Sequence, residues 1–313
     1  MIYYFLNSLK EIFSPLNVFQ YITFRSAAAA ILALIISFIL GPIIIRKLRY
    51  YQIGEEIREH GPESHIKKRG TPTMGGIIIL SAIILPTLLL ADLQNPYIQI
   101  ISISIIWMGF IGFIDDYLKT IKKIKSGLVA KYKLAGQISL GIIITFWIYN
   151  TSEWDNFRTV TSVPFLKDAV IDFGLLYPLI IILVITGSSN AVNLTDGLDG
   201  LAAGLLAICF TVFSAIAYIS GRIDFSDYLN IIYLPGVGEL TIFSAACVGA
   251  CIGYLWFNAA PAEVFMGDVG SLSTGAALGT LAILLKKEFL LTIIEGVFVA
   301  EALSVILQVS FFK

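Results

Sequence analysis

Three short polar stretches interrupt an otherwise apolar chain, and they hold the residues best suited to chemistry. The first, FIDDYLK (113–119), sets Asp115 beside Asp116 and places Lys119 within one helical turn of both. Adjacent carboxylates suit the coordination of a divalent metal, or a general base whose neighbour tunes its pKa. A solvated helix end with one ion pair is the simpler alternative, and this stretch alone favours neither.

The second stretch is SSNAVNLTDGLDGLAAG (188–204), which lies between two long apolar runs. Asn190, Asn193, Asp196 and Asp199 follow one another at intervals of three, so on a helix they form a band of neighbours, which the intervening glycines are expected to break into a turn. Asn and Asp oxygens are hard ligands for Mg²⁺ and good acceptors for N–H groups of a sugar or base. Helix capping explains one Asp and the glycines, but not the two Asn, so a functional role is favoured.

The third stretch is FNAAPAEVFMGDVGS (257–271). Asp268 lies between Gly267 and Gly270 just before an apolar run, where either a metal ligand or an ordinary N-cap is expected. Phe265 is an aromatic ring in a polar loop, and such a ring can stack on a nucleobase or pack into the membrane interface. Packing is the commoner outcome for such a ring.

A glycine-rich stretch, GTPTMGG (70–76), follows Lys67, Lys68 and Arg69 directly. Backbone N–H groups at a helix start approach an anion closely, and the helix dipole favours negative charge there. Ordinary capping and close helix packing would give the same pattern. Acids that bind Mg²⁺ beside groups that bind phosphate are typical of phosphoryl transfer.

Long apolar helices must position these residues. The chain has 313 residues, of which 57% are hydrophobic and only 14% charged, and its mean hydropathy is +0.86. Because about 20 apolar residues cross the hydrocarbon core, we expect one domain, 1–313, that is an all-α polytopic membrane bundle rather than a β-barrel. Nine spans are predicted: Ser26–Ile45, Gly70–Ala91, Leu93–Ile114, Leu134–Ser152, Phe173–Thr195, Gly200–Gly221, Leu240–Ala262, Val269–Leu285 and Phe289–Phe312.

The basic residues predict the orientation of this bundle. Segment 46–69 has seven of them and segment 115–133 has six, whereas seven are spread over all the segments of the opposite side. The positive-inside rule puts 46–69 and 115–133 in the cytoplasm and the N-terminus outside, with Lys286–Lys287 as the one mild violation. Counting spans then puts the acidic stretches around 187–200 and 258–270 on the same cytoplasmic face.

With the closing EALSVILQVSFFK (301–313), these motifs make the chain similar to the phospho-N-acetylmuramoyl-pentapeptide-transferases over nearly its whole length. These bacterial enzymes form a branch of the polyprenyl-phosphate N-acetylhexosamine-1-phosphate transferase family. The resemblance implies transfer of phospho-MurNAc-pentapeptide from its UDP carrier to undecaprenyl phosphate in the inner membrane. The implied products are lipid I and UMP, with Mg²⁺ as cofactor. It allows a homodimer, and no nucleic-acid partner is expected.

The resemblance also implies residue roles. Asp115 would contact and deprotonate the lipid phosphate, Asp116 would support it or the metal, and Asp268 would be the main Mg²⁺ ligand. Phe265 resembles a uracil-stacking ring. The implied substrate-binding residues are Lys68, Thr73, Lys119, Lys131, Asn190, Asn193, Asp196, Asp199 and Asn258.

Two points limit the resemblance. The family has ten spans and a His-rich loop before the tenth, whereas this sequence stops at Lys313, so the chain is expected to be C-terminally incomplete relative to the family. A sister transferase that moves GlcNAc-1-phosphate would share the acidic stretches but not GTPTMGG or the closing segment. A nucleotide-sugar transporter, the alternative of another class, would need repeat symmetry and charges deep in several spans.

Overall fold

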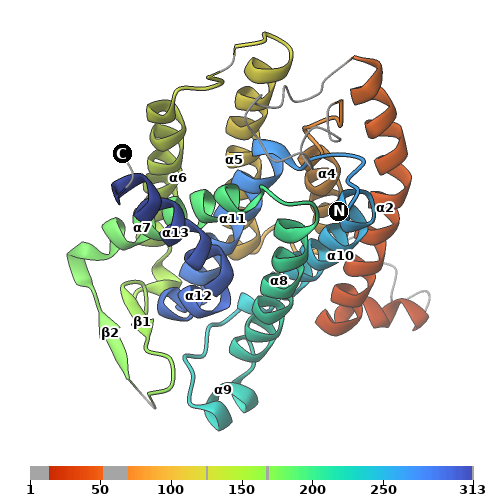
Figure 1. The fold of residues 1–313 in the computed structure, drawn as a ribbon. Helices are drawn as coiled ribbons and strands as arrows, with labels where there is room; N and C mark the ends of the chain where they lie inside the picture. Colours follow the sequence, from red (N-terminus) through yellow and green to blue (C-terminus); the bar gives the residue numbers. More distant parts are fainter. Residues whose placement is uncertain (1–13, 52–69, 125, 167–168, 312–313) are drawn as a thin grey trace.

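The structure is a computed structural model that describes residues 14–51, 70–124, 126–166 and 169–311 (Figure 1), and within these ranges it is a bundle of helices with one small hairpin. The prediction of an all-α membrane bundle is confirmed. The helices are η1 (Ser14–Gln20), α2 (Ile22–Tyr50), α4 (Gly76–Leu90), α5 (Pro96–Thr120), α6 (Ala130–Asn150), η2 (Ser152–Trp154), η3 (Gly174–Leu176), α7 (Tyr177–Thr195), α8 (Leu201–Ser220), α9 (Ile223–Leu229), η4 (Val237–Glu239), α10 (Leu240–Asn258), α11 (Gly267–Leu284), α12 (Glu288–Ile294) and α13 (Gly296–Phe311). The strands β1 (Val160–Ser162) and β2 (Val170–Asp172) pair antiparallel.

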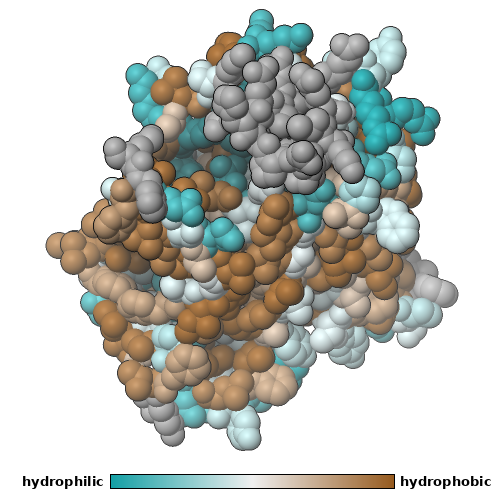
Figure 2. Space-filling model, in the orientation of Figure 1, coloured by the Kyte–Doolittle hydropathy of each residue, from teal (hydrophilic) through white to brown (hydrophobic). Residues whose placement is uncertain are grey.

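Five helices of the described residues are long and apolar enough to cross a bilayer, or six if the bent pair α12 and α13 counts as one span. All nine segments predicted as spans contain a helix, but α4, with 15 residues, is shorter than a typical span. Nine spans therefore remains a prediction. A broad apolar band crosses the molecule in Figure 2, and hydrophilic residues gather at the end where α5 and α6 are joined in Figure 1.

Helix α11 is the centre of the bundle, because every residue from Asp268 to Leu284 is buried. It packs against α5, α7 and α4. Small residues permit this close packing. A Cβ on Gly76 of α4 would lie 2.1 Å from the backbone nitrogen of Gly270, and one on Gly112 of α5 would lie 2.2 Å from the carbonyl oxygen of Asp268.

The last predicted span, Phe289–Phe312, is broken into two helices in the structure. Helices α12 and α13 meet at Glu295 and are bent by 82°. Glu295 is buried and reaches Ser188 on α7, whereas Glu301 is exposed. Pairing a buried carboxyl with a neighbouring helix offers a physical reason for the break at this point.

Several charged residues at the end of the bundle opposite the acidic cluster are buried. Arg25 of α2 forms a bidentate ion pair with Glu239, and it also donates to the carbonyl oxygen of Leu90 at 3.0 Å. Lys286 and Lys287, the mild exception to the positive-inside rule, are buried too. The ammonium group of Lys286 donates to the carbonyl oxygen of Arg158, just before β1, and that of Lys287 donates to the hydroxyl of Ser162 in β1. Their role in tying the hairpin to the bundle accounts for their place there.

Candidate active site

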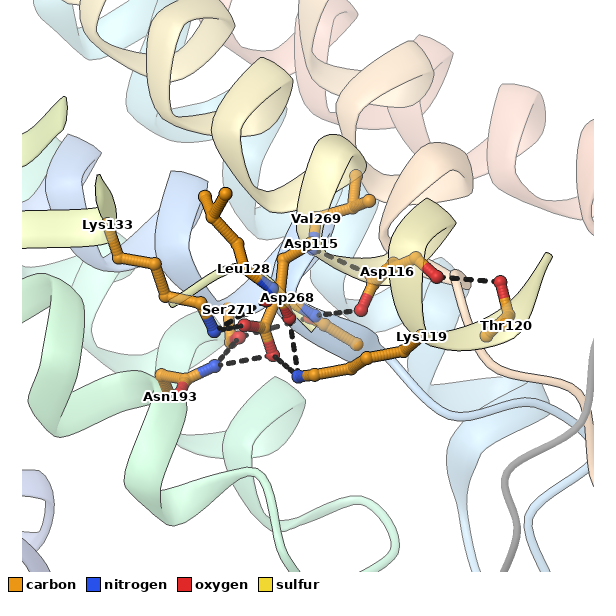
Figure 3. A network of polar contacts seen from close by, with 11 residues as sticks. Asp115, Asp116, Lys119, Thr120, Leu128, Lys133, Asn193, Asp268, Val269 and Ser271 are labelled. Atoms are coloured by element: carbon orange, nitrogen blue, oxygen red, sulfur yellow. Dashed lines mark hydrogen bonds and ion pairs between the residues drawn. The ribbon is translucent and has the colours of Figure 1, made fainter. Parts of the chain in front are cut away.

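Three buried carboxylates come together where α5 ends and α11 begins (Figure 3). Asp115 and Asp116 lie in the last turns of α5, and Asp268 lies in the first turn of α11. One ligand oxygen from each falls within 4.8 Å of the others, a spacing at which one metal ion could be held. Carboxylates from the stretches 113–119 and 257–271, which lie far apart in the sequence, therefore form one cluster.

Asp116 positions the start of α11. Its Oδ1 accepts the backbone N–H of Asp268 at 3.2 Å, and its Oδ2 accepts that of Val269 at 3.0 Å. A carboxylate at a helix N-terminus satisfies orphan N–H groups and complements the helix dipole. Gly267 precedes this turn with a φ of 71°, and a Cβ there would lie 2.6 Å from Asp116 Oδ2. Glycine at this position therefore permits the close approach.

Asp115 is fully buried and faces two lysines. Its Oδ1 accepts the backbone N–H of Leu128 at 2.7 Å and lies 3.1 Å from the ammonium nitrogen of Lys133, and its Oδ2 is paired with Lys119. The sequence spacing placed Lys119 beside both Asp115 and Asp116, and in the structure it pairs with Asp115. The hydrogen bond to Leu128 ties the α5–α6 connection to the cluster, so Asp115 fixes the entry to α6 as well.

Asp268 is held by side chains from three helices. Lys133 of α6 donates to its Oδ2, Lys119 of α5 lies 3.5 Å from its Oδ1, and Asn193 of α7 donates to its Oδ1 at 3.1 Å. Asn193 also donates to Ser271 at 2.8 Å. The side chains of the two lysines and of Asn193 all point at Asp268 in Figure 3. The Asp268 carboxylate is thus surrounded by three side chains with N–H donors. These side chains could change partners when an anionic ligand or a cation binds.

Lys133 is a site residue that the sequence reasoning missed, because it was counted only among the basic residues of segment 115–133. A signal was present in the sequence. Lys133 stands one helical turn before Gln137, a polar residue inside an apolar run. In the structure Gln137 is buried and its Oε1 accepts from Asn190 of α7 at 3.1 Å, while Lys133 reaches Asp115 of α5 and Asp268 of α11.

The predicted band of Asn190, Asn193, Asp196 and Asp199 divides into two parts. The two Asn remain on α7, whereas a turn separates α7 from α8 as the glycines predicted. Asp196 ends α7, and Asp199 accepts the backbone N–H of Ala262 at 3.2 Å. Asn193 thus contacts Asp268 of the cluster, and Asn190 contacts Gln137 of α6 beside it.

Asn258 connects the same two loops. Its Oδ1 accepts the backbone N–H of Gly200 at 3.0 Å, and its Nδ2 donates to the carbonyl oxygen of Val264 at 2.9 Å. Asn258 is buried, and both the oxygen and the nitrogen of its side-chain amide are hydrogen-bonded. It therefore holds the α7–α8 turn against the loop before α11. Its predicted contact with substrate stays a prediction.

The remaining predicted residues lie at different distances from the cluster. Thr73 is buried beside Gly267, and a Cβ on that glycine would lie 3.0 Å from the Thr73 hydroxyl. Phe265 is half-buried, and its backbone bonds to Pro72 and Gly75 join its loop to the GTPTMGG stretch. Lys131 is exposed, with its ammonium over the ring of the neighbouring tyrosine. Lys68 lies outside the described residues. The substrate contacts of all four stay predictions.

The donor set of the cluster fits a hard divalent cation. Carboxylate oxygens are the ligands that such ions prefer. Asp268 is the best placed of the three, because its carboxylate is contacted by the side chains of Lys133 and Asn193, whereas Asp116 and Asp115 already accept backbone N–H groups. The cluster is therefore suited to a metal with Asp268 as the principal ligand.

Comparison with known proteins bears on this site. The model of glycosyl transferase family 4 matches residues 98–286, which include all three carboxylates. A phospho-N-acetylmuramoyl-pentapeptide-transferase signature matches residues 68–80, which include the GTPTMGG stretch. The fold and the acidic cluster thus define a polytopic membrane transferase.

Curated relatives narrow this class. Phospho-N-acetylmuramoyl-pentapeptide-transferases of Thermodesulfovibrio yellowstonii and Desulfosudis oleivorans are each 50% identical over 313 residues, which is all of this chain and 86% of each relative. That of Chloroherpeton thalassium is 50% identical over 315 residues, with 85% of its length covered. The chain belongs to the phospho-N-acetylmuramoyl-pentapeptide-transferase family.

Proposed function

We propose that the chain transfers phospho-N-acetylmuramoyl-pentapeptide from its UDP carrier to undecaprenyl phosphate. A phosphate oxygen of the lipid attacks the phosphorus that carries the sugar. The bond from this phosphorus to the oxygen it shares with UMP breaks, so UMP leaves and lipid I forms. One observation carries this proposal: three buried carboxylates and two lysines meet at one end of a helical bundle in a member of this family.

Mg²⁺ is the metal that we assign to the cluster, with Asp268 as its first ligand and Asp116 as a second. When bound, it would neutralise charge on the diphosphate and polarise the reacting phosphorus. Asp116 keeps its hydrogen bonds to the start of α11, so its main contribution is to hold Asp268 in place. This arrangement gives the two acids different tasks although they stand in one cluster.

Asp115 is the residue that we assign to the lipid phosphate. It is buried beside Lys119 and Lys133, whose ammonium groups can bind phosphate oxygens as the substrates enter. Preorganised positive charge stabilises the negative charge that spreads over the transferring phosphoryl group. Lys119 and Lys133 therefore belong to the binding machinery, and each exchanges a carboxylate partner for a phosphate.

The nucleotide-sugar is placed on the α7 side of the cluster. Asn190 and Asn193 offer amide groups there. Asp199, in the α7–α8 turn, accepts the backbone N–H of Ala262, so this turn is joined to the α10–α11 loop that carries Phe265 and the two segments close the site on that side. The half-buried ring of Phe265 is available for stacking on uracil. Asp196, at the end of α7, is assigned to the same substrate.

The site faces the cytoplasm of a bacterial inner membrane in this proposal. The support is the excess of basic residues in segments 46–69 and 115–133. The end of α5, the start of α6 and the start of α11 meet at the cluster. This agrees with the count of spans, which put the segments 115–133 and 258–270 on the same side of the membrane. The cytosolic nucleotide and a phosphate at the membrane surface can both reach this end.

The test uses purified protein in detergent with Mg²⁺, undecaprenyl phosphate and one UDP-sugar at a time. With UDP-MurNAc-pentapeptide we expect equal amounts of UMP and lipid I, measured by liquid chromatography and mass spectrometry. With UDP-GlcNAc we expect neither product. Product from UDP-GlcNAc alone would favour the sister transferase, and uptake of intact nucleotide-sugar into proteoliposomes without UMP would favour a transporter.

A further inference from the structure

Glu295 is a buried carboxyl that the proposed reaction does not use. It lies at the elbow where α12 ends and α13 begins, and only 3% of its surface is exposed. The side chains recorded against it within the described residues are Ser188 of α7 and Cys209 of α8, and neither is a cation. An unpaired carboxylate in this apolar setting would be expensive. The carboxyl therefore has reason to stay neutral.

The hydrogen bonds of Ser188 point to the same state. Its Oγ lies 2.7 Å from the carbonyl oxygen of Gly275 on α11 and 2.5 Å from Oε1 of Glu295. A serine hydroxyl has one proton to donate, whereas a carbonyl and an ionised carboxylate are both acceptors. Both contacts are satisfied if Ser188 donates to Gly275 and a protonated Glu295 donates to Ser188.

This junction joins the two helices that carry the site. Ser188 lies five residues before Asn193 on α7, and Gly275 lies seven residues after Asp268 on α11. The helices are closely packed at the junction, since a Cβ on Gly275 would lie 2.8 Å from the backbone of Ser188 and Ser189. A change in the separation of α7 and α11 here would therefore lengthen or break the hydrogen bond between Asn193 and Asp268.

We propose that Glu295, in its protonated form, is a positioning residue for the transferase: it locks the α12–α13 elbow onto α7 and α11 and so holds Asn193 against Asp268. Glu295 touches neither substrate nor the acidic cluster. Its effect is exerted through Ser188. The inference rests on the proposed function. Its claim about the placement of α13 against α7 can be tested by a distance measurement that does not depend on enzyme activity.

The structural test measures a distance between α7 and α13. Spin labels are placed at Leu183→Cys and Leu307→Cys, two exposed positions on those helices, and the distance distribution is recorded by pulsed electron resonance in nanodiscs. The lock predicts one narrow distribution for the parent and for Glu295→Gln, whose amide can also donate to Ser188. It predicts a broadened distribution for Glu295→Leu. Equal distributions in all three proteins would overturn the lock.

The kinetic test separates a proton donor from a carboxylate. Loss of the buried hydrogen bond in Glu295→Leu should lower kcat about tenfold and leave the KM of undecaprenyl phosphate within about twofold. Glu295→Gln should restore kcat. A Glu295→Gln variant as slow as Glu295→Leu would overturn the proposal, because the ionised form would then be the active one.

The pH dependence gives a readout that a merely structural role would not produce. As pH rises from about 7 to about 10, Glu295 begins to lose its proton, whereas the glutamine cannot. The ratio of wild-type kcat to Glu295→Gln kcat should therefore fall. Among the described residues, the titratable group that interacts with Glu295 is the thiol of Cys209, which is common to both proteins and cancels in the ratio. A constant ratio would contradict the proposal.

Discussion

Asp116 accepts the backbone N–H of Asp268 at 3.2 Å, so one acid of the cluster sets the position of another. Because its second oxygen binds the next N–H of α11, Asp116 acts on the whole first turn of that helix. The cluster is thus more than three carboxylates placed near each other. It is a helix terminus anchored to the end of α5.

Removing this anchor should affect both stability and turnover. Asp116→Ala leaves two buried N–H groups without their acceptor, which costs about 1–3 kcal/mol for each group. Asp116→Asn keeps a carbonyl oxygen for one of them. We expect the detergent melting temperature to follow the order wild type, Asp116→Asn, Asp116→Ala, with turnover in the same order. An Asp116→Ala protein as stable as wild type would contradict the anchoring role.

Lys133 should matter although no sequence motif marks it. Lys133→Met removes the ammonium shared by Asp115 and Asp268, and loss of such a buried partner typically costs about 3–5 kcal/mol. We expect a loss of UMP release of about 100-fold or more. Lys122→Met is the matched control, since Lys122 is exposed in the α5–α6 connection, and it should keep wild-type turnover. Equal activity of the two variants would exclude Lys133 from the site.

The close contact of α5 with α11 predicts a sharp difference between two glycines. Gly112→Ala would place a Cβ 2.2 Å from the carbonyl oxygen of Asp268, so the helices must separate at the site. Gly204→Ala, on α8, meets no atom within 4 Å and removes a poor helix former. We expect Gly112→Ala to lose most of its activity and melt several degrees lower, and Gly204→Ala to match or exceed wild-type stability. Similar melting of the two would contradict this packing.

Lys286 should make stability depend on pH. Burial, offset in part by Glu288, lowers the pKa of Lys286 from 10.5 to about 8. Between these values the unfolded chain binds more protons than the folded one, so stability rises as pH increases from about 8 to 10.5. The full effect is about 3 kcal/mol. Melting curves of wild type should show this rise and those of Lys286→Met should lack it; a rise that persists in the variant would assign it to another group.

Much of the site could be predicted from the sequence, because the residue types were unusual for their surroundings. Asp115, Asp116 and Asp268 are carboxylates at the ends of apolar runs, and parity of the spans put them on one face. The same reasoning predicted the turn between α7 and α8. These features depend on composition and local spacing, which are visible in one sequence.

The missed features depend on contacts between helices. Lys131 and Lys133 are two lysines of the same basic segment, and the packing of α6 turns Lys133 toward Asp268 and leaves Lys131 exposed. The elbow at Glu295 was missed for a similar reason, since Ser188 lies more than 100 residues away. An apolar run predicts a helix but does not show where a distant side chain breaks it.

The central claim is that the cluster around Asp268 performs metal-dependent phosphoryl transfer. The most direct measurement compares UMP release by purified wild type and Asp268→Asn across a Mg²⁺ titration, with binding of UDP-MurNAc-pentapeptide measured in parallel to show that the variant is folded. The account predicts Mg²⁺-dependent UMP release from wild type and none from Asp268→Asn at any Mg²⁺ concentration. Wild-type turnover by Asp268→Asn, with the same Mg²⁺ dependence, would contradict it.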